Sequence, residues 1–183
     1  MEPSPPPPVP HRNKEARQMA DISKAHTDPK GQLWEAVENA TAIMVGSTDH
    51  SQHMQPMAPL LARDEEAIWF YTKADTELAQ TVGSQGGTVH VCLIGKDHDF
   101  HACLRGHLSV QRSPEHIERF WSPMAEAWFG DKDNPGLTML CFKPGHAEIW
   151  ASTDSRIRFG WEIAKANVTD AEPDVGYKTE INF

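Results

Sequence analysis

The amino-acid sequence predicts a mainly β protein of the α+β class, in which an antiparallel barrel carries a few peripheral helices. About seven short apolar or alternating segments follow one another through brief polar turns, which is typical of antiparallel strands. Helical periodicity appears at only a few points between these segments. An alternating parallel fold needs a helix after nearly every strand, so the pattern favours an antiparallel barrel.

The two ends of the chain differ in composition from its centre. Residues 1–28 are rich in proline, including the run Pro5–Pro8, and predict a disordered tail. A proline-rich ligand for an aromatic groove is the alternative for this segment. We expect the barrel domain over residues 33–152. A polar C-terminal extension follows over residues 153–183, in which Arg156–Ile163 fits either a strand or a short helix.

The first half of the domain is predicted to hold three strands between two helices. Pro29-Lys30-Gly31 is expected to stop any earlier helix, and a short amphipathic helix then covers Leu33–Val37. The strands are expected at Ala42–Ser47, Met54–Leu61 and Ala67–Thr72. The third strand leads into a helix from Thr76 to Gly83, with Asp75 as its N-cap. Free backbone N–H groups at such a junction can hold a phosphate, so we expect any cofactor there.

The second half of the domain shows the clearest alternation. Strands are predicted at Thr88–Ile94 and Phe100–Gln111, the longer of which has one apolar and one polar face. A final hairpin is expected at Leu137–Phe142 and Ala147–Ala151, with its turn at Lys143-Pro144-Gly145.

Two short helices are predicted between the long strand and this hairpin. Each starts with a serine cap followed by proline, at Ser113-Pro114 and at Ser122-Pro123. Trp121 and Trp128 fall near helical spacing, which favours a place in the core. The alternative is that these two side chains, together with Trp150, wall a flat ligand.

Charge and hydropathy exclude several classes of partner. The chain has 26 acidic and 17 basic residues and a formal net charge of −9, so a nucleic-acid surface is not expected. No apolar run approaches the ~20 residues that a membrane helix needs, and the N-terminus lacks the apolar core of a signal peptide. We therefore expect a cytoplasmic protein that binds neither nucleic acid nor membrane.

Cysteine and histidine patterns predict no metal site. Cys92, Cys103 and Cys141 are odd in number and irregularly spaced, so we expect buried, reduced thiols rather than disulfides or a zinc site. Asp97–Asp99 and His101 could be a metal or haem ligand set. Turn residues and alternate strand residues face apart, however, so a polar strand face in a subunit interface is the favoured interpretation.

Several weak motifs in the right order carry a family resemblance. They are Gln55-Pro56-Met57-Ala58-Pro59, Trp69-Phe70-Tyr71-Thr72, Ala127-Trp128-Phe129-Gly130, Asp133-Asn134-Pro135-Gly136-Leu137 and Ala147-Glu148-Ile149-Trp150. Over residues 33–152 the chain resembles the pyridoxamine 5'-phosphate oxidase-like, FMN-binding split-barrel family, and within it the general stress protein group. This resemblance implies a split barrel, a homodimer, and a flavin held in a cleft between the two subunits.

The resemblance also implies which residues contact the flavin. The segment Gln55, Pro56, Met57, Ala58 and Pro59 matches the family's strand beside the isoalloxazine and ribityl chain. Tyr71 and Thr72 match a pair at the end of the third strand, and Thr76 falls in the phosphate-binding segment. His101 takes the place of a flavin-contacting glutamine.

The chain departs from the family pattern around the phosphate. Glu77 and Leu78 stand where the oxidases have adjacent basic residues, and Gln55 stands where they have arginine. An acid in place of cationic donors loses charge-assisted hydrogen bonds to a phosphate. Three basic residues could replace the missing donors: Lys73, Arg63 and Arg105. FMN is the expected cofactor, with FAD or another flavin as alternatives.

Three functions follow from this combination. The first is a dimeric flavin-dependent oxidoreductase acting on a small-molecule substrate, with no side chain identified as acid or base. The second is a non-catalytic flavin-binding protein connected with stress, with a degenerate phosphate site. The third is a dimeric scaffold that has lost its cofactor.

Overall fold

The structure is a computed structural model, and it describes residues 27–48, 53–96, 98–152 and 176–183. The proline-rich segment and Arg156–Ile163 lie outside the described residues. Among the described helices, none is long and apolar enough to cross a membrane.

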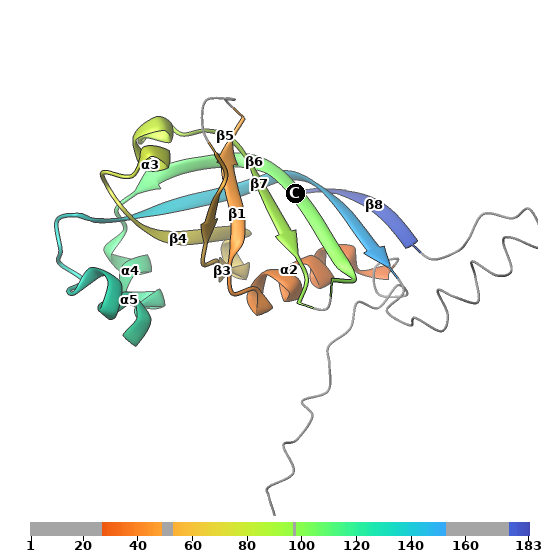
Figure 1. Ribbon diagram of the computed structural model, residues 1–183, viewed down its shortest axis with the longest axis horizontal. Helices are drawn as coiled ribbons and strands as arrows, with labels where there is room; N and C mark the ends of the chain where they lie inside the picture. The colour runs from red at the N-terminus through yellow and green to blue at the C-terminus, as the bar shows by residue number, and fades with distance from the viewer. Residues whose placement is uncertain (1–26, 49–52, 97, 153–175) are drawn as a thin grey trace, which may run out of the picture.

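The described strands form one antiparallel sheet that curls into a half-barrel (Figure 1). They are β1 (Ile43–Ser47), β2 (Gln55–Met57), β3 (Leu60–Ala62), β4 (Ala67–Lys73), β5 (Gly87–Ile94), β6 (Phe100–Gln111), β7 (Leu137–Ser152) and β8 (Gly176–Asn182). Their order across the sheet is β2-β1-β5-β6-β7-β4-β3, and β8 pairs with β7. The helices are α2 (Pro29–Asn39), α3 (Glu77–Val82), α4 (Pro114–Phe120) and α5 (Pro123–Phe129). The mainly β, antiparallel fold with peripheral helices is thus confirmed.

The segment predicted as one strand over Met54–Leu61 is two strands at opposite edges of the sheet. β2 pairs with β1, whereas β3 pairs with β4. The chain passes between them at Ala58 and Pro59. Pro56 lies on the edge strand, where its missing N–H costs no ladder hydrogen bond. The prediction of a single strand was wrong because apolar patterning does not show that the chain changes partners.

The predicted hairpin at the end of the domain is also wrong, because β7 is a single strand of 16 residues. Gly106 on β6 faces Pro144, whereas its neighbour Arg105 faces His146, so Gly145 is an extra residue in the ladder. The Pro-Gly signal therefore makes a β-bulge instead of a turn. The first part of β7 pairs with β4 and the second part with β8.

Capping explains where the helices begin. Ser113 and Ser122 accept hydrogen bonds from the backbone of His116 and Ala125, which confirms the two predicted starts. The helix predicted over Leu33–Val37 begins earlier, at Pro29, where the side chain of Asp28 accepts a hydrogen bond from the N–H of Gly31 at 2.9 Å.

Two apolar clusters pack on opposite faces of the sheet. The inner cluster fills the curl, where α2 contributes Leu33, Trp34 and Val37 against Phe70 and Phe142. The outer cluster lies under α4 and α5 and consists of Ala62, Ala67, Trp69, Ile117, Leu137, Met139 and Cys141. Figure 1 shows α4 and α5 side by side at one end of the sheet.

The rest of the outer face, on β5, β6 and the second part of β7, is not covered by any described helix. We call this surface the open face. Its side chains include Cys92, Ile94, His101, Cys103 and Trp150, which alternate with buried residues along their strands. Ile94 is 60% exposed and Trp150 is 40% exposed. Large apolar side chains on an uncovered sheet face mark a contact surface.

Candidate functional site

The end of β4 and the turn into α3 bring together three of the predicted site residues. The hydroxyl of Thr76 donates to the backbone oxygen of Lys73 at 3.0 Å. Thr72 and Thr76 are joined through their hydroxyl oxygens at 3.1 Å, so Thr72 is the donor in that bond. Both hydroxyl protons are therefore used inside the turn. Thr76, not Asp75, occupies the N-cap position of α3, which corrects the predicted cap.

Tyr71 precedes this turn and is fixed on the outer side of β4. Its hydroxyl donates to the backbone oxygen of Ile117 at 2.7 Å. Its ring lies edge-on to Trp121 at 6.0 Å and 5.7 Å from the ring of Phe129. Burial, with a smaller contribution from the charge of Glu118, raises the pKa of Tyr71 to about 12. Near pH 7 the side chain of Tyr71 is therefore neutral, and its ring is held in one orientation. It does not act as a base at that pH.

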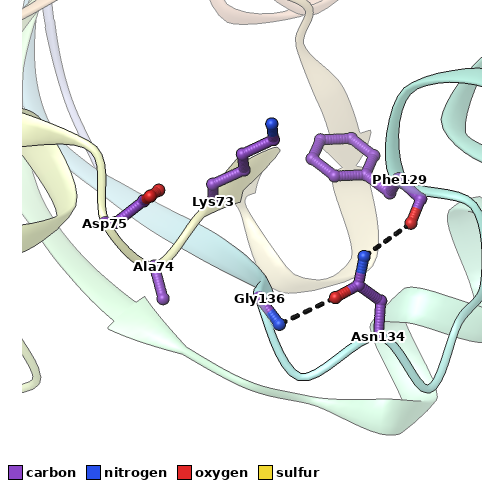
Figure 2. A pocket seen from close by; sticks show the side chains of 6 residues that line it. All are labelled: Lys73, Ala74, Asp75, Phe129, Asn134 and Gly136. Atoms are coloured by element: carbon purple, nitrogen blue, oxygen red, sulfur yellow. Dashed lines mark hydrogen bonds between the residues drawn. The ribbon is translucent and has the colours of Figure 1, made fainter.

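A cavity of about 350 Å³ opens beside this turn. It is lined by Lys73, Ala74, Asp75, Phe129, Asn134 and Gly136. Asn134 holds its rim by donating to the Phe129 oxygen at 2.7 Å and accepting from the Gly136 N–H at 2.8 Å. Figure 2 shows the Lys73 side chain extending between Asp75 and Phe129. Its ammonium has no hydrogen-bond or ion-pair partner among the described residues.

The predicted strand beside the flavin follows the crossing from one sheet edge to the other. Pro56 and Ala58 are exposed, and Gln55, Met57 and Pro59 are half-buried. The crossing therefore presents backbone and side chains on the surface rather than in the core.

His101 lies far from the other predicted site residues in the same chain. It faces Ile94 and Trp150 on the open face. Tyr71 pairs with Met139 on β7, and Met139 pairs with Gln111 on β6. Gln111 is ten positions from His101 along β6. At about 3.3 Å per residue, that separation is roughly 30 Å. One chain thus holds two groups of predicted contacts at opposite ends of the sheet.

The alternative metal or haem set is not assembled in the described residues. His98 sits in a left-handed turn with φ of 61°, whereas His101 is on the strand. In the part of the chain that the structure describes, no three metal-ligating side chains converge. Asp97 lies outside the described residues.

The prediction that Trp128 is a core residue was wrong, because 74% of it is exposed. Pro123 separates α4 from α5, so the spacing from Trp121 to Trp128 does not run along one helix. Trp121 is half-buried and packs on Tyr71.

Sequence reasoning missed a polar cluster on the covered side. His116 lies 2.7 Å from Glu65 through Nε2 and 2.7 Å from the hydroxyl of Ser113 through Nδ1, and its ring stacks on Trp69 at 3.8 Å. Burial is the largest single influence on the pKa of Glu65 and acts to raise it, but the hydrogen bond and charge of His116, with smaller contributions from Trp69 and Lys143, together lower that pKa. Only the short Ser113–His116 spacing is visible in the sequence. The cluster anchors α4 to the turn before β4.

Comparison with known proteins decides the family. A model of the family described as "Pyridoxamine 5'-phosphate oxidase like" matches residues 28–174. The chain belongs to this family. Among curated proteins, none matches the sequence.

Solved structures of relatives confirm the split-barrel fold of this oxidase-like protein. A candidate general stress protein 26 from Jannaschia sp. is 32% identical, with 86% of this chain and 99% of that chain covered and a TM-score of 0.72. The general stress FMN/FAD binding protein of Xanthomonas citri is 31% identical, with 68% and 89% covered and a TM-score of 0.63. An FMN-binding, pyridoxamine 5'-phosphate oxidase-related protein from Nostoc punctiforme is 13% identical, with 84% and 96% covered and a TM-score of 0.57, and shows the fold alone.

The structure distinguishes among the three basic residues that were expected to contact a phosphate. Arg63 is held by Glu38 through two hydrogen bonds of 2.7 and 2.6 Å. Arg105 lies on the open face, away from α3. Glu77 is exposed at the start of α3, whereas Leu78 is buried. Lys73 is therefore the cation that remains beside the turn.

Proposed function

We propose that this chain binds FMN as a cytoplasmic homodimer and uses the flavin to move a hydride or electrons to a small-molecule substrate. Membership of the family and the 31% identity to an FMN/FAD binding protein support a flavin as the ligand. A bound flavin would supply the redox chemistry, and the protein would bind, orient and enclose it.

The observation that carries this proposal is the separation of the expected contacts within one chain. Tyr71, Thr72 and Thr76 lie at one end of the sheet, and His101 lies roughly 30 Å away at the other. A flavin is too small to span that distance in a single chain. A partner related by a two-fold axis supplies the half of the site that each chain lacks. The exposed Ile94 and Trp150 beside His101 fit such a contact surface.

Lys73 is the residue that we assign to the FMN phosphate. Its free ammonium lies at the cavity, and the hydroxyls of Thr72 and Thr76 are already committed to other bonds. A charge-assisted hydrogen bond contributes about 1.5–3 kcal/mol, or roughly 10- to 100-fold in Kd. Asp75 and Glu77 oppose the phosphate, so we expect weaker binding than a site with two adjacent cations gives.

Other predicted contacts have positioning roles. The crossing at Gln55, Pro56, Met57, Ala58 and Pro59 would border the isoalloxazine and ribityl chain. Tyr71, held by its bond to Ile117, keeps its ring in place at the edge of the site.

The first test is the absorption spectrum of the purified protein, followed by heat release and mass spectrometry of the supernatant. Added FMN and riboflavin are then titrated by fluorescence, and the mass in solution is measured by light scattering. A flavin-loaded dimer is the expected result. A colourless protein that fails to quench FMN fluorescence overturns the proposal and leaves the cofactor-free scaffold.

A pair of lysine variants tests the assignment of the phosphate site. Lys73→Met should weaken FMN binding at least about 10-fold and leave riboflavin unchanged, because riboflavin has no phosphate. Lys96→Met, an exposed lysine in the turn after β5, is the matched control and should change neither. If Lys73→Met weakened the binding of FMN and of riboflavin equally, the assignment would be contradicted.

Catalysis is separated from storage by anaerobic mixing of the flavin-loaded protein with NADH or NADPH. Bleaching of the flavin absorbance supports the oxidoreductase. Stable binding without bleaching by either donor favours the non-catalytic flavin-binding protein, whereas Glu77 and Leu78 are the features that support the cofactor-free scaffold.

A further inference from the structure

The open face contains two thiols that neither the fold nor the proposed function uses. Cys92 on β5 and Cys103 on β6 face each other in the ladder, and their sulfur atoms are 3.6 Å apart. Both side chains are half-buried, whereas Cys141 is buried in the outer cluster under α4 and α5.

The ladder geometry places this pair where side chains approach most closely. The N–H of Gly95 donates to the oxygen of Phe100 at 2.7 Å, which makes Gly95 and Phe100 a hydrogen-bonded pair. Hydrogen-bonded and non-hydrogen-bonded pairs alternate along antiparallel strands, so Cys92 and Cys103, three positions further on, form a non-hydrogen-bonded pair. The Cα atoms of such pairs lie about 4.5 Å apart, within the range of disulfides.

We propose that Cys92 and Cys103 are a reversible redox modification site that closes to a disulfide across β5 and β6. The oxidant is a low-molecular-weight disulfide. One cysteine, as its thiolate, attacks a sulfur of the oxidant and releases one small thiol. The other cysteine then attacks the mixed disulfide, releases the second small thiol and loses its own proton. The protein gives up two electrons and two protons, and the oxidant becomes two thiols.

The surroundings of Cys103 limit how fast its thiol reacts. Burial, followed by the hydrogen bond from Cys92, raises the pKa of Cys103 to about 11. The Cys103 thiolate is therefore scarce at neutral pH, and attack by Cys103 on an oxidant is slow. The closure needs little movement, because the strands already hold the two sulfur atoms in contact.

The disulfide can form without a flavin, because both thiols belong to one chain and neither is assigned to the flavin site. It lies two ladder positions from the Ile94–His101 pair on the open face. A failure to bind FMN would leave this proposal intact, and a failure to form the disulfide would leave the flavin proposal intact.

The experiment incubates the full-length protein with oxidised glutathione to equilibrium and then counts free thiols under denaturing conditions. The native chain should fall from three free thiols to one, with the loss of two hydrogen atoms in the intact mass. Peptide mapping should find the peptides that contain Cys92 and Cys103 linked by a disulfide. Dithiothreitol should restore all three thiols.

Single serine variants provide the matched controls. Cys141→Ser should lose both of its remaining thiols, whereas Cys92→Ser and Cys103→Ser should form no internal disulfide. The far-ultraviolet circular dichroism of each variant checks that it is folded. The proposal is overturned if the native chain keeps three thiols, carries only glutathione adducts, or cross-links only between chains.

Discussion

The outer face of the sheet has two halves that differ in one respect. On the covered half, Trp69, Met139 and Cys141 are buried under α4 and α5. On the open half, side chains at equivalent outward positions, such as Ile94 and Trp150, remain exposed. Both halves belong to the same continuous strands β6 and β7. The difference therefore comes from the helices inserted between these strands and not from the strands themselves.

The comparison shows where stability and function separate in this fold. The covered half is fixed by packing and by bonds such as Tyr71 to Ile117 and His116 to Glu65. The open half contributes little to the core of the single chain, and it carries His101 and the two paired thiols, all half-buried. We expect substitutions on the covered half to change stability, and those on the open half to change binding.

The largest expected effect comes from Ile117, which is buried in the outer cluster. Ile117→Ala should lower the free energy of unfolding by about 3 kcal/mol, because it leaves a cavity under α4. The matched control is Ile94→Ala on the open face, which should cost the single chain no more than about 0.5 kcal/mol when compared at a concentration where the dimer is dissociated. Urea denaturation measures both, and equal losses would remove the distinction between the two halves.

The junction of the two halves is the bulge where Gly106 faces Pro144. A Cβ atom at position 106 would lie 2.3 Å from the backbone oxygen of Lys143. Gly106→Ala should therefore destabilise the fold by about 2 kcal/mol, since backbone must shift. Gly176→Ala on β8, where the nearest atom is 3.7 Å away, is the control. A neutral Gly106→Ala would show that the bulge can relax.

Tyr71 provides a pH test of the covered half. Its folded-state pKa of about 12 exceeds the ordinary value near 10, so the unfolded chain loses the proton first as the pH rises. The contribution of Tyr71 to the free energy of unfolding is fully present below pH 10 and is lost as the pH rises to 12. Tyr71→Phe should lose about 1 kcal/mol at pH 8 and show a shallower decline above pH 10. Parallel stability curves for the two proteins would contradict this assignment.

The smallest effect is expected for an ion pair on the open side. Lys178 on β8 lies 3.1 Å from Glu148 on β7, and both side chains are well exposed. Solvent screening leaves such pairs with little net energy, so Lys178→Ala should unfold at the same urea concentration as the native protein. If Lys178→Ala clearly lowered the stability, and high salt lowered the stability of the native protein by a similar amount, charge would contribute to the stability of the open half.

Local patterns predicted much of the fold. The alternation in Phe100–Gln111 and the serine-proline starts of α4 and α5 were sufficient, because side-chain direction and capping depend on neighbours in the chain. The long-range features were not predictable in this way. The bond between His116 and Glu65 joins residues 51 positions apart, and β8 lies in a stretch whose strand the patterning did not indicate.

The candidate site also combines features that local patterns predict with features that depend on long-range contacts. Sequence motifs predicted Tyr71, Thr72, Thr76 and His101 as site residues. They do not show that His101 lies at the far end of the sheet, or that Arg63 is hydrogen-bonded to Glu38. Strand alternation, helix caps and family motifs could be predicted without a fold, because each depends on residues a few positions apart. Three features appear only in the folded chain: the edge crossing at Ala58, the bulge at Gly145 and the exposure of Trp128. Each of them depends on which distant segment packs alongside.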